Sequence, residues 1–171
     1  KSQGFEVVGS DDNIYPPMSD RLAALDISVL KPSAENLEKE KPDLVVVGNA
    51  ISKPHVEAQA LLASDIPYVS MPEAMHHFYL QHKDVIVVSG THGKTTTTTL
   101  MAHLLREMGH EPSYFIGGVY QKTGSSFELG NGPHFVIEGD EYDTAFFDKG
   151  PKFLHYNPKH VITTSLEFDH A

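Results

Sequence analysis

An apolar strand that runs directly into a glycine loop and a helix is the feature that most constrains how this chain can fold. Residues 84–89 contain the uninterrupted apolar run Val85-Ile86-Val87-Val88, which is typical of a strand buried on both faces of a parallel sheet. The sequence Gly90-Thr91-His92-Gly93-Lys94-Thr95 follows, and residues 95–108 are expected to form a helix that ends at Gly109. Strand, glycine loop and helix in this order predict an α/β fold with a phosphate-binding turn.

Strands and helices are expected to alternate along the rest of the chain. We expect further strands at residues 5–9, 29–30, 44–48, 66–69, 114–116, 134–137 and 160–164, and further helices at residues 21–25, 33–39, 55–63 and 72–80. This order predicts two doubly wound parallel sheets, with a domain boundary near His82 and a glycine-rich stretch over residues 117–133. Residues 1–4 resemble the end of a helix, so we expect the chain to begin inside a domain.

The glycine loop has the side chains that a nucleotide phosphate requires. Glycines let backbone N–H groups close around an anion at the positive end of a helix. Lys94 is expected to reach the β- and γ-phosphates, and the Thr95 hydroxyl is expected to bind Mg²⁺. Val88 stands where the general phosphate-loop pattern has glycine, so the loop is a variant. The alternative is a glycine turn with an incidental Lys-Thr pair.

Acidic residues follow the predicted strand at residues 134–137. Glu138, Asp140, Glu141 and Asp143 lie within six positions of one another, and ligands collect at the carboxyl ends of parallel strands. Such closely spaced carboxylates repel each other unless a cation lies among them, which predicts Mg²⁺ there; the alternative is a solvated acidic turn. His170 follows the last predicted strand and is a second metal-ligand candidate, although a lone histidine there is more often a surface residue.

Composition excludes several classes of protein. The chain has 13 Lys and Arg against 23 Asp and Glu, a net charge of −10, which argues against binding through many nucleic-acid phosphates. It has no cysteine, which excludes disulfides and thiolate metal sites. No apolar run approaches the roughly 18 residues of a membrane-spanning helix. We therefore expect a soluble, cytoplasmic protein with no nucleic-acid or membrane partner.

With these motifs in view, the chain resembles the Mur ligases, which build the peptide stem of the bacterial cell wall. The loop matches the branch that reads T-H-G-K-T-T, and Gly139-Asp140-Glu141-Tyr142-Asp143 with Leu166 to Ala171 is similar to the members that add a murein tripeptide during cell-wall recycling. The resemblance implies an incomplete Rossmann-like parallel-sheet domain at residues 1–82 that binds UDP-N-acetylmuramate. An incomplete P-loop central α/β domain at residues 83–171 would bind ATP.

The resemblance also implies roles for individual residues. It assigns catalysis to Lys94, Glu141 and His170, and metal binding to Thr95, Glu141 and His170. ATP would be bound by Gly90, Thr91, His92, Gly93, Lys94, Thr95 and Thr96. The nucleotide sugar would be bound by Ser10, Asp11, Asn49, Ala50, Ile51 and His92, although Asp, Ser and Asn also cap helices in ordinary loops. Ser165 stands where these ligases usually have Asn, and it carries no assigned role.

The implied reaction is ATP-dependent amide formation with ATP and Mg²⁺. A murein tripeptide, or alternatively L-alanine, would be joined to UDP-N-acetylmuramate through an acyl phosphate. A P-loop kinase or NTPase, and a nucleotide-binding module without turnover, are the alternatives from other classes. The resemblance places the amine-binding domain after Ala171, so residues 1–171 alone are not expected to ligate. Oligomeric state and the identity of the amine cannot be read from these residues.

Overall fold

The computed structural model describes residues 1–167 and divides the chain into two compact units. One unit comprises Lys1–Val45 and Ile51–Tyr68, and the other comprises Val46–Ala50 and the residues from Val69 onward. This division follows packing alone. The predicted domains, residues 1–82 and 83–171, stay a prediction.

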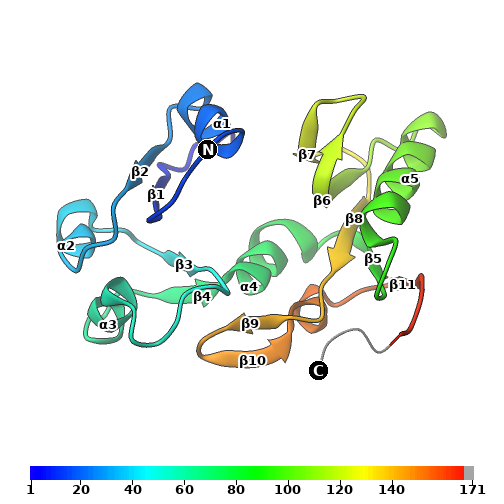
Figure 1. Cartoon of the computed structure of the whole chain (residues 1–171). Helices are drawn as coiled ribbons and strands as arrows, with labels where there is room; N and C mark the ends of the chain where they lie inside the picture. The colour runs from blue at the N-terminus through cyan, green and yellow to red at the C-terminus, as the bar shows by residue number, and fades with distance from the viewer. Residues whose placement is uncertain (168–171) are drawn as a thin grey trace. The chain divides into compact units, whose positions relative to one another are not determined.

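The first unit contains short strands and helices in alternation (Figure 1). Its elements are β1 (Val8–Ser10), α1 (Met18–Ala24), β2 (Ser28–Leu30), α2 (Asn36–Glu40) and α3 (Val56–Leu62). Strands β1 and β2 pair in parallel, with Val8 opposite Ser28. Two further strands, β3 (Val45–Val47) and β4 (Tyr68–Ser70), pair with each other where the chain passes between the units. The predicted alternation is therefore confirmed, with shorter strands than expected.

The second unit is built on a five-stranded sheet in the order β11-β5-β8-β6-β7. The strands are β5 (Asp84–Ser89), β6 (Ser113–Tyr120), β7 (Ser125–Glu128), β8 (His134–Gly139) and β11 (His160–Thr163). All neighbours are parallel except β6 and β7, which are antiparallel. The predicted α/β fold class is confirmed.

Helical segments lie before and after the strand that leads into the glycine loop. The helix α4 (Met71–Met75) continues as the π-helix η1 (His76–Leu80), and α5 (Lys94–Glu107) begins directly after the loop. A small antiparallel pair, β9 (Asp143–Ala145) and β10 (Asp148–Pro151), and the 3-10 helix η2 (Lys152–Tyr156) follow β8; neither was predicted. No helix within residues 1–167 is long and apolar enough to span a bilayer.

Both faces of the central strands β5 and β8 are buried, because these strands are apolar at consecutive positions. Ile86 and Val88 of β5 face a cluster that includes Ala102 of α5, whereas Val85 and Val87 face a cluster that includes Leu80 of η1. Helix α5 therefore covers one face of this sheet, as Figure 1 shows, and η1 and η2 cover the other. The glycine loop starts from the best-packed strand of the unit.

The glycine-rich stretch over residues 117–133, for which no strand was predicted, contains the end of β6 and all of β7. Strand β6 continues through Gly117 and Gly118 to Tyr120, and Gly124, with a φ of +66°, lies in the turn that leads into β7. The sheet provides backbone partners that compensate for the low strand propensity of glycine. A Cβ at position 118 would lie 3.0 Å from Cγ2 of Thr95, so a larger residue there would require the Thr95 side chain to shift.

The central position of β5 leads to a stability prediction. Val87 is fully buried, whereas its register partner Val161 on β11 is 57% exposed. Val87→Ala should lower the free energy of unfolding by about 1–3 kcal/mol, because it removes two packed methyl groups and leaves a cavity. The matched Val161→Ala should cost less than about 1 kcal/mol. Equal losses in chemical denaturation would contradict the assigned packing.

Candidate functional site

The glycine loop is held in a conformation that other residues could not adopt. Gly90 has a φ of +130° and Gly93 a φ of +82°, both in the region that favours glycine. A Cβ on Gly90 would lie 2.3 Å from Oγ1 of Thr164 and 2.8 Å from the carbonyl oxygen of Ser165. Helix α5 then begins at Lys94 without a side-chain cap, so its first N–H groups can bind an anion.

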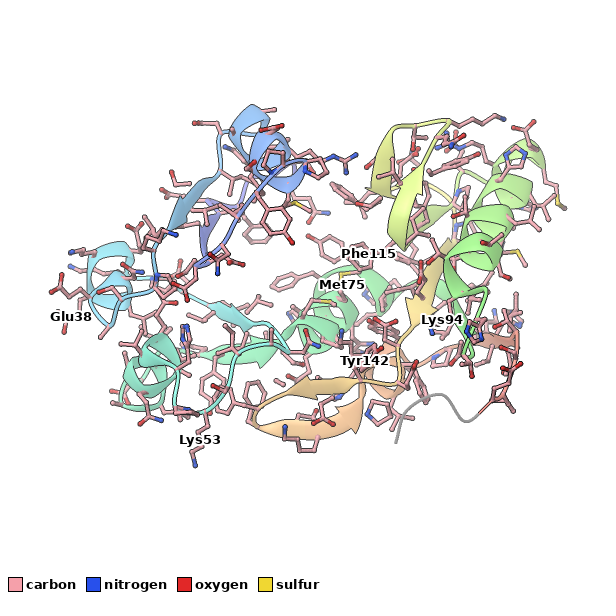
Figure 2. The ribbon with its side chains drawn as sticks, in the orientation of Figure 1. Glu38, Lys53, Met75, Lys94, Phe115 and Tyr142 are labelled. Atoms are coloured by element: carbon pink, nitrogen blue, oxygen red, sulfur yellow. The ribbon has the colours of Figure 1, made fainter. Side chains whose placement is uncertain are left out.

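Lys94 folds back over the loop that precedes it. Its Nζ donates to the carbonyl oxygen of Gly90 at 2.6 Å and lies 3.6 Å from Oε2 of Glu141. The side chain is only 16% exposed and lies at the start of α5 (Figure 2). Lys94 and Glu141, two of the predicted catalytic residues, are therefore brought together.

Thr95 is paired with a different acid. Its hydroxyl donates to Oε2 of Glu138 at 3.1 Å, and Oε1 of Glu138 accepts from the backbone N–H of Gly117 at 2.6 Å. Glu138 thus joins the start of α5 to strand β6. We had predicted Glu141 as the acid that shares a metal ion with Thr95, and that assignment stays a prediction. The structure adds Glu138 as the acid closest to the Thr95 hydroxyl.

A signal for Glu138 was present in the sequence. Glu138 lies in β8 opposite Val88, one position before the end of the strand that feeds the loop. An acid at the end of the neighbouring parallel strand is placed at the same sheet edge as the loop. Gly117 leaves room for it, since a Cβ there would lie 3.3 Å from Oε2 of Glu138.

The two remaining acids of this segment also have cationic partners. Oδ2 of Asp140 lies 3.6 Å from Nζ of Lys152, and Oδ2 of Asp143 accepts from Nζ of Lys149 at 2.9 Å. Burial, with a smaller contribution from Asp140, raises the pKa of Tyr156 far above its usual value. Within residues 1–167, no group of three or more His, Cys, Asp or Glu side chains is placed to hold a metal ion. Lysine side chains thus lie beside three of the acids that we expected to surround Mg²⁺.

The segment after β11 is bonded to the loop. Thr91 Oγ1 donates to the carbonyl oxygen of Glu167 and accepts from its backbone N–H, both at 3.0 Å. The carbonyl oxygen of Ser165 accepts from the N–H of Thr91 at 3.1 Å, and its Oγ accepts from the N–H of His92 at 3.1 Å. Ser165, for which the sequence indicated no role, therefore supports the loop. We call residues 164–167 the loop brace.

The remaining predicted ATP-site residues lie at the surface. The His92 ring is exposed, with Nδ1 3.9 Å from Oε2 of Glu167. Thr96 is exposed at the third position of α5. His170 lies outside the described residues.

In the first unit, Ser10 and Asp11 occupy the carboxyl end of β1, as predicted. Ser10 Oγ donates to Oε2 of Glu57 at 2.8 Å. Asp11 Oδ1 accepts from the N–H of Asn13 at 2.8 Å, the local turn bond that Asp commonly makes. Both residues are exposed, and their role in binding a nucleotide sugar stays a prediction.

Asn49, Ala50 and Ile51 follow β3 as expected. Within the second unit, Asn49 lines an open cavity of about 450 Å³ together with Glu141, Tyr142 and Asp143. The half-buried Ile51 belongs to the first unit.

Comparison with known proteins identifies the family. The model described as "Mur ligase family, catalytic domain" matches residues 1–83. UDP-N-acetylmuramate–L-alanyl-gamma-D-glutamyl-meso-2,6-diaminoheptandioate ligase of Escherichia coli (strain K12) is 45% identical over 168 residues, 98% of this chain and 37% of that protein. UDP-N-acetylmuramate–L-alanine ligase of Lachnoclostridium phytofermentans is 34% identical over 99% of this chain and 34% of that protein. The chain belongs to the Mur ligase family.

A solved structure agrees with this assignment. The crystal structure of the UDP-N-acetylmuramate:L-alanyl-gamma-D-glutamyl-meso-diaminopimelate ligase from Neisseria meningitides matches with a TM-score of 0.94 and 42% identity, over 99% of this chain and 55% of that one. The chain spans little more than a third of the length of the curated relatives it matches.

The reciprocal bonds between Thr91 and Glu167 lead to a prediction about the loop brace. Thr91→Val keeps the shape of the side chain but removes both bonds, so hydrogen exchange at the Glu167 amide should accelerate by about fivefold to tenfold. Peptide-level mass spectrometry measures this. Thr163→Val, an exposed position on β11, is the matched control. Unchanged exchange in Thr91→Val would contradict the brace.

Proposed function

We propose that the protein containing this chain is an ATP-dependent amide ligase that joins the murein tripeptide L-alanyl-γ-D-glutamyl-meso-diaminopimelate to UDP-N-acetylmuramate. The observation that carries the proposal is the pairing at the start of α5, where Lys94 faces Glu141 and Thr95 faces Glu138. This arrangement provides a cation, a hydroxyl and two carboxylates beside a free helix N-terminus. The names of the more similar relatives suggest the substrates.

Lys94 is suited to neutralise a triphosphate. Its present partners are the neutral carbonyls of Gly90 and Thr91 and the carboxylate of Glu141 at 3.6 Å, and a phosphate oxygen is a stronger acceptor than a carbonyl. When ATP binds, Nζ would exchange Gly90 for the β- and γ-phosphates. Lys94 would then reduce the repulsion between ATP and the carboxylate of UDP-N-acetylmuramate that attacks its γ-phosphate. This attack would displace ADP and form an acyl phosphate, and the tripeptide amine would then attack the acyl carbon and release phosphate and a proton.

Thr95 and Glu138 fit a magnesium site. Hydroxyl and carboxylate oxygens are the ligands that Mg²⁺ prefers, and these two are already in contact. Mg²⁺ would supply positive charge beside the phosphates. Glu138 is held by the N–H of Gly117, which fixes the direction of its carboxylate. Glu141 and His170, the residues we first predicted as ligands, remain candidates for the metal shell.

The nucleotide sugar is proposed to bind at the residues predicted from the sequence. Ser10 and Asp11 would contact the uridine. Asn49, Ala50 and Ile51 would line the path of the diphosphate and sugar, and His92 would lie near the muramyl group. The exposure of Ser10, Asp11 and His92 supports this role, since a bound ligand must be able to reach them.

We also propose a cytoplasmic location, because ATP is used there and the chain has no cysteine.

The choice of amine rests on similarity. Tripeptide ligases of Escherichia coli and Haemophilus influenzae are 45% and 43% identical to this chain, whereas alanine ligases of Syntrophomonas wolfei and Chlorobium chlorochromatii are 32% and 38% identical. L-alanine is the alternative amine.

The test is phosphate release and amide formation by the full-length protein with ATP, Mg²⁺ and UDP-N-acetylmuramate. We expect product with the tripeptide and little with L-alanine. Lys94→Ala should lower kcat/KM at least about 100-fold, because the phosphates lose their nearest cation. Lys122→Ala, at an exposed pair with Glu107, is the matched control and should keep normal activity. Turnover with alanine only would overturn the proposed amine.

The two acids can be separated by their effect on metal dependence. Glu138→Gln should raise the Mg²⁺ concentration needed for half-maximal activity by about tenfold or more, because a metal-ligating charge is lost. Glu141→Gln should change mainly the KM for ATP through Lys94. An increased Mg²⁺ requirement in Glu141→Gln but not in Glu138→Gln would contradict the assignment of Glu138.

A further inference from the structure

A single carboxylate in the first unit, that of Glu57, accepts hydrogen bonds from three residues that lie 21 to 47 positions before it. Oε2 of Glu57 accepts from Ser10 Oγ at 2.8 Å, and Oε1 accepts from Asn36 Nδ2 at 2.7 Å and from the N–H of Ser33 at 3.4 Å. These donors belong to the last position of β1, to the connection between β2 and α2, and to the start of α2. All four residues lie in the same compact unit.

Glu57 is itself firmly placed. It lies in the first turn of α3, where the positive end of the helix favours an acidic side chain. Its backbone N–H donates to Nδ1 of His55, the N-cap residue, at 3.3 Å. The backbone of Glu57 is therefore anchored at the start of α3. Its carboxylate contacts the end of β1 and the residues that follow β2.

The contact with Glu57 fixes how Ser10 can bind a ligand. A carboxylate can only accept, so the single proton of the Ser10 hydroxyl points at Glu57. The Ser10 oxygen is left with free acceptor positions and no donor. Ser10 is exposed, so a ligand can reach this oxygen. Such a ligand must offer an N–H or O–H group, and a phosphate oxygen would be repelled both by that oxygen and by the nearby negative charge.

We propose that Glu57 is a positioning residue for the nucleotide sugar, which orients Ser10 as an acceptor for an N–H or O–H group of the uridine. The inference rests on the proposed function, because it takes UDP-N-acetylmuramate as the ligand of this unit. It assigns Ser10 to the neutral nucleoside part of that ligand and not to its diphosphate. Glu57 acts through Ser10 and does not touch the ligand.

Glu57→Gln provides a specific test of this geometry. An amide N–H₂ in place of Oε2 would donate to Ser10, so the Ser10 hydroxyl would have to reverse and present its proton to the ligand. Calorimetric binding of UDP-N-acetylmuramate to the full-length protein should weaken by about tenfold. The KM for this substrate should rise while kcat and the KM for ATP stay within about twofold, and the melting temperature should stay near that of the wild type.

Two comparisons separate this role from a general structural one. Glu38→Gln changes the same functional group at an exposed position of α2 (Figure 2) and should leave binding unchanged. In a Ser10→Ala background, Glu57→Gln should have less than about a twofold further effect, because the residue through which it acts is gone. A tenfold further loss in that background, or unchanged binding in the single variant, would overturn the inference.

The binding measurement also separates this inference from the proposed function. If the wild-type protein binds UDP-N-acetylmuramate but forms no amide, the ligase proposal fails, and the calorimetric comparison still decides the role of Glu57. If the wild type does not bind UDP-N-acetylmuramate, the inference about Glu57 is overturned.

Discussion

The parallel pairing of β5 with β8 on one side and β11 on the other is the constraint on which the candidate site depends. Ser89 at the end of β5 lies opposite both Gly139 and Thr163, so the three strands end at the same edge. The glycine loop, Glu138 and the loop brace must therefore meet there. The same packing explains why Gly90 cannot be replaced, since the chain after β11 occupies the space of a side chain.

Three of the four acids at this edge are paired with lysines. Lys94 faces Glu141, Lys152 faces Asp140, Lys149 faces Asp143, and Glu138 is bonded to Thr95. Each ion pair reduces the repulsion between neighbouring carboxylates. Phosphates entering the loop would compete for Lys94, and a metal ion would compete for Glu138. The contacts of Lys94 and Glu138 therefore mark the residues that ligand binding would rearrange.

The sequence predicted the parts that follow from apolar pattern and glycine placement. The buried strand at residues 84–89 is confirmed with its bounds, because four consecutive apolar residues are typical of a strand that is buried on both faces of a sheet. Strand β7 and the continuation of β6 through Gly117 were missed, because glycine and polar residues join a sheet through partners distant in sequence. Glu138 and Ser165 were undervalued for the same reason, since their bonds reach across 43 and 73 positions.

The central claim is that Lys94 and the Thr95–Glu138 pair form the phosphate and metal site. A crystal structure of the full-length protein with the non-hydrolysable analogue β,γ-imido-ATP and Mn²⁺ tests it most directly, because Mn²⁺ can be located by its anomalous signal. We predict that Nζ of Lys94 leaves the Gly90 carbonyl for the phosphates and that Mn²⁺ contacts Thr95 and Glu138. An analogue bound elsewhere, with Lys94 still on Gly90, would contradict the account.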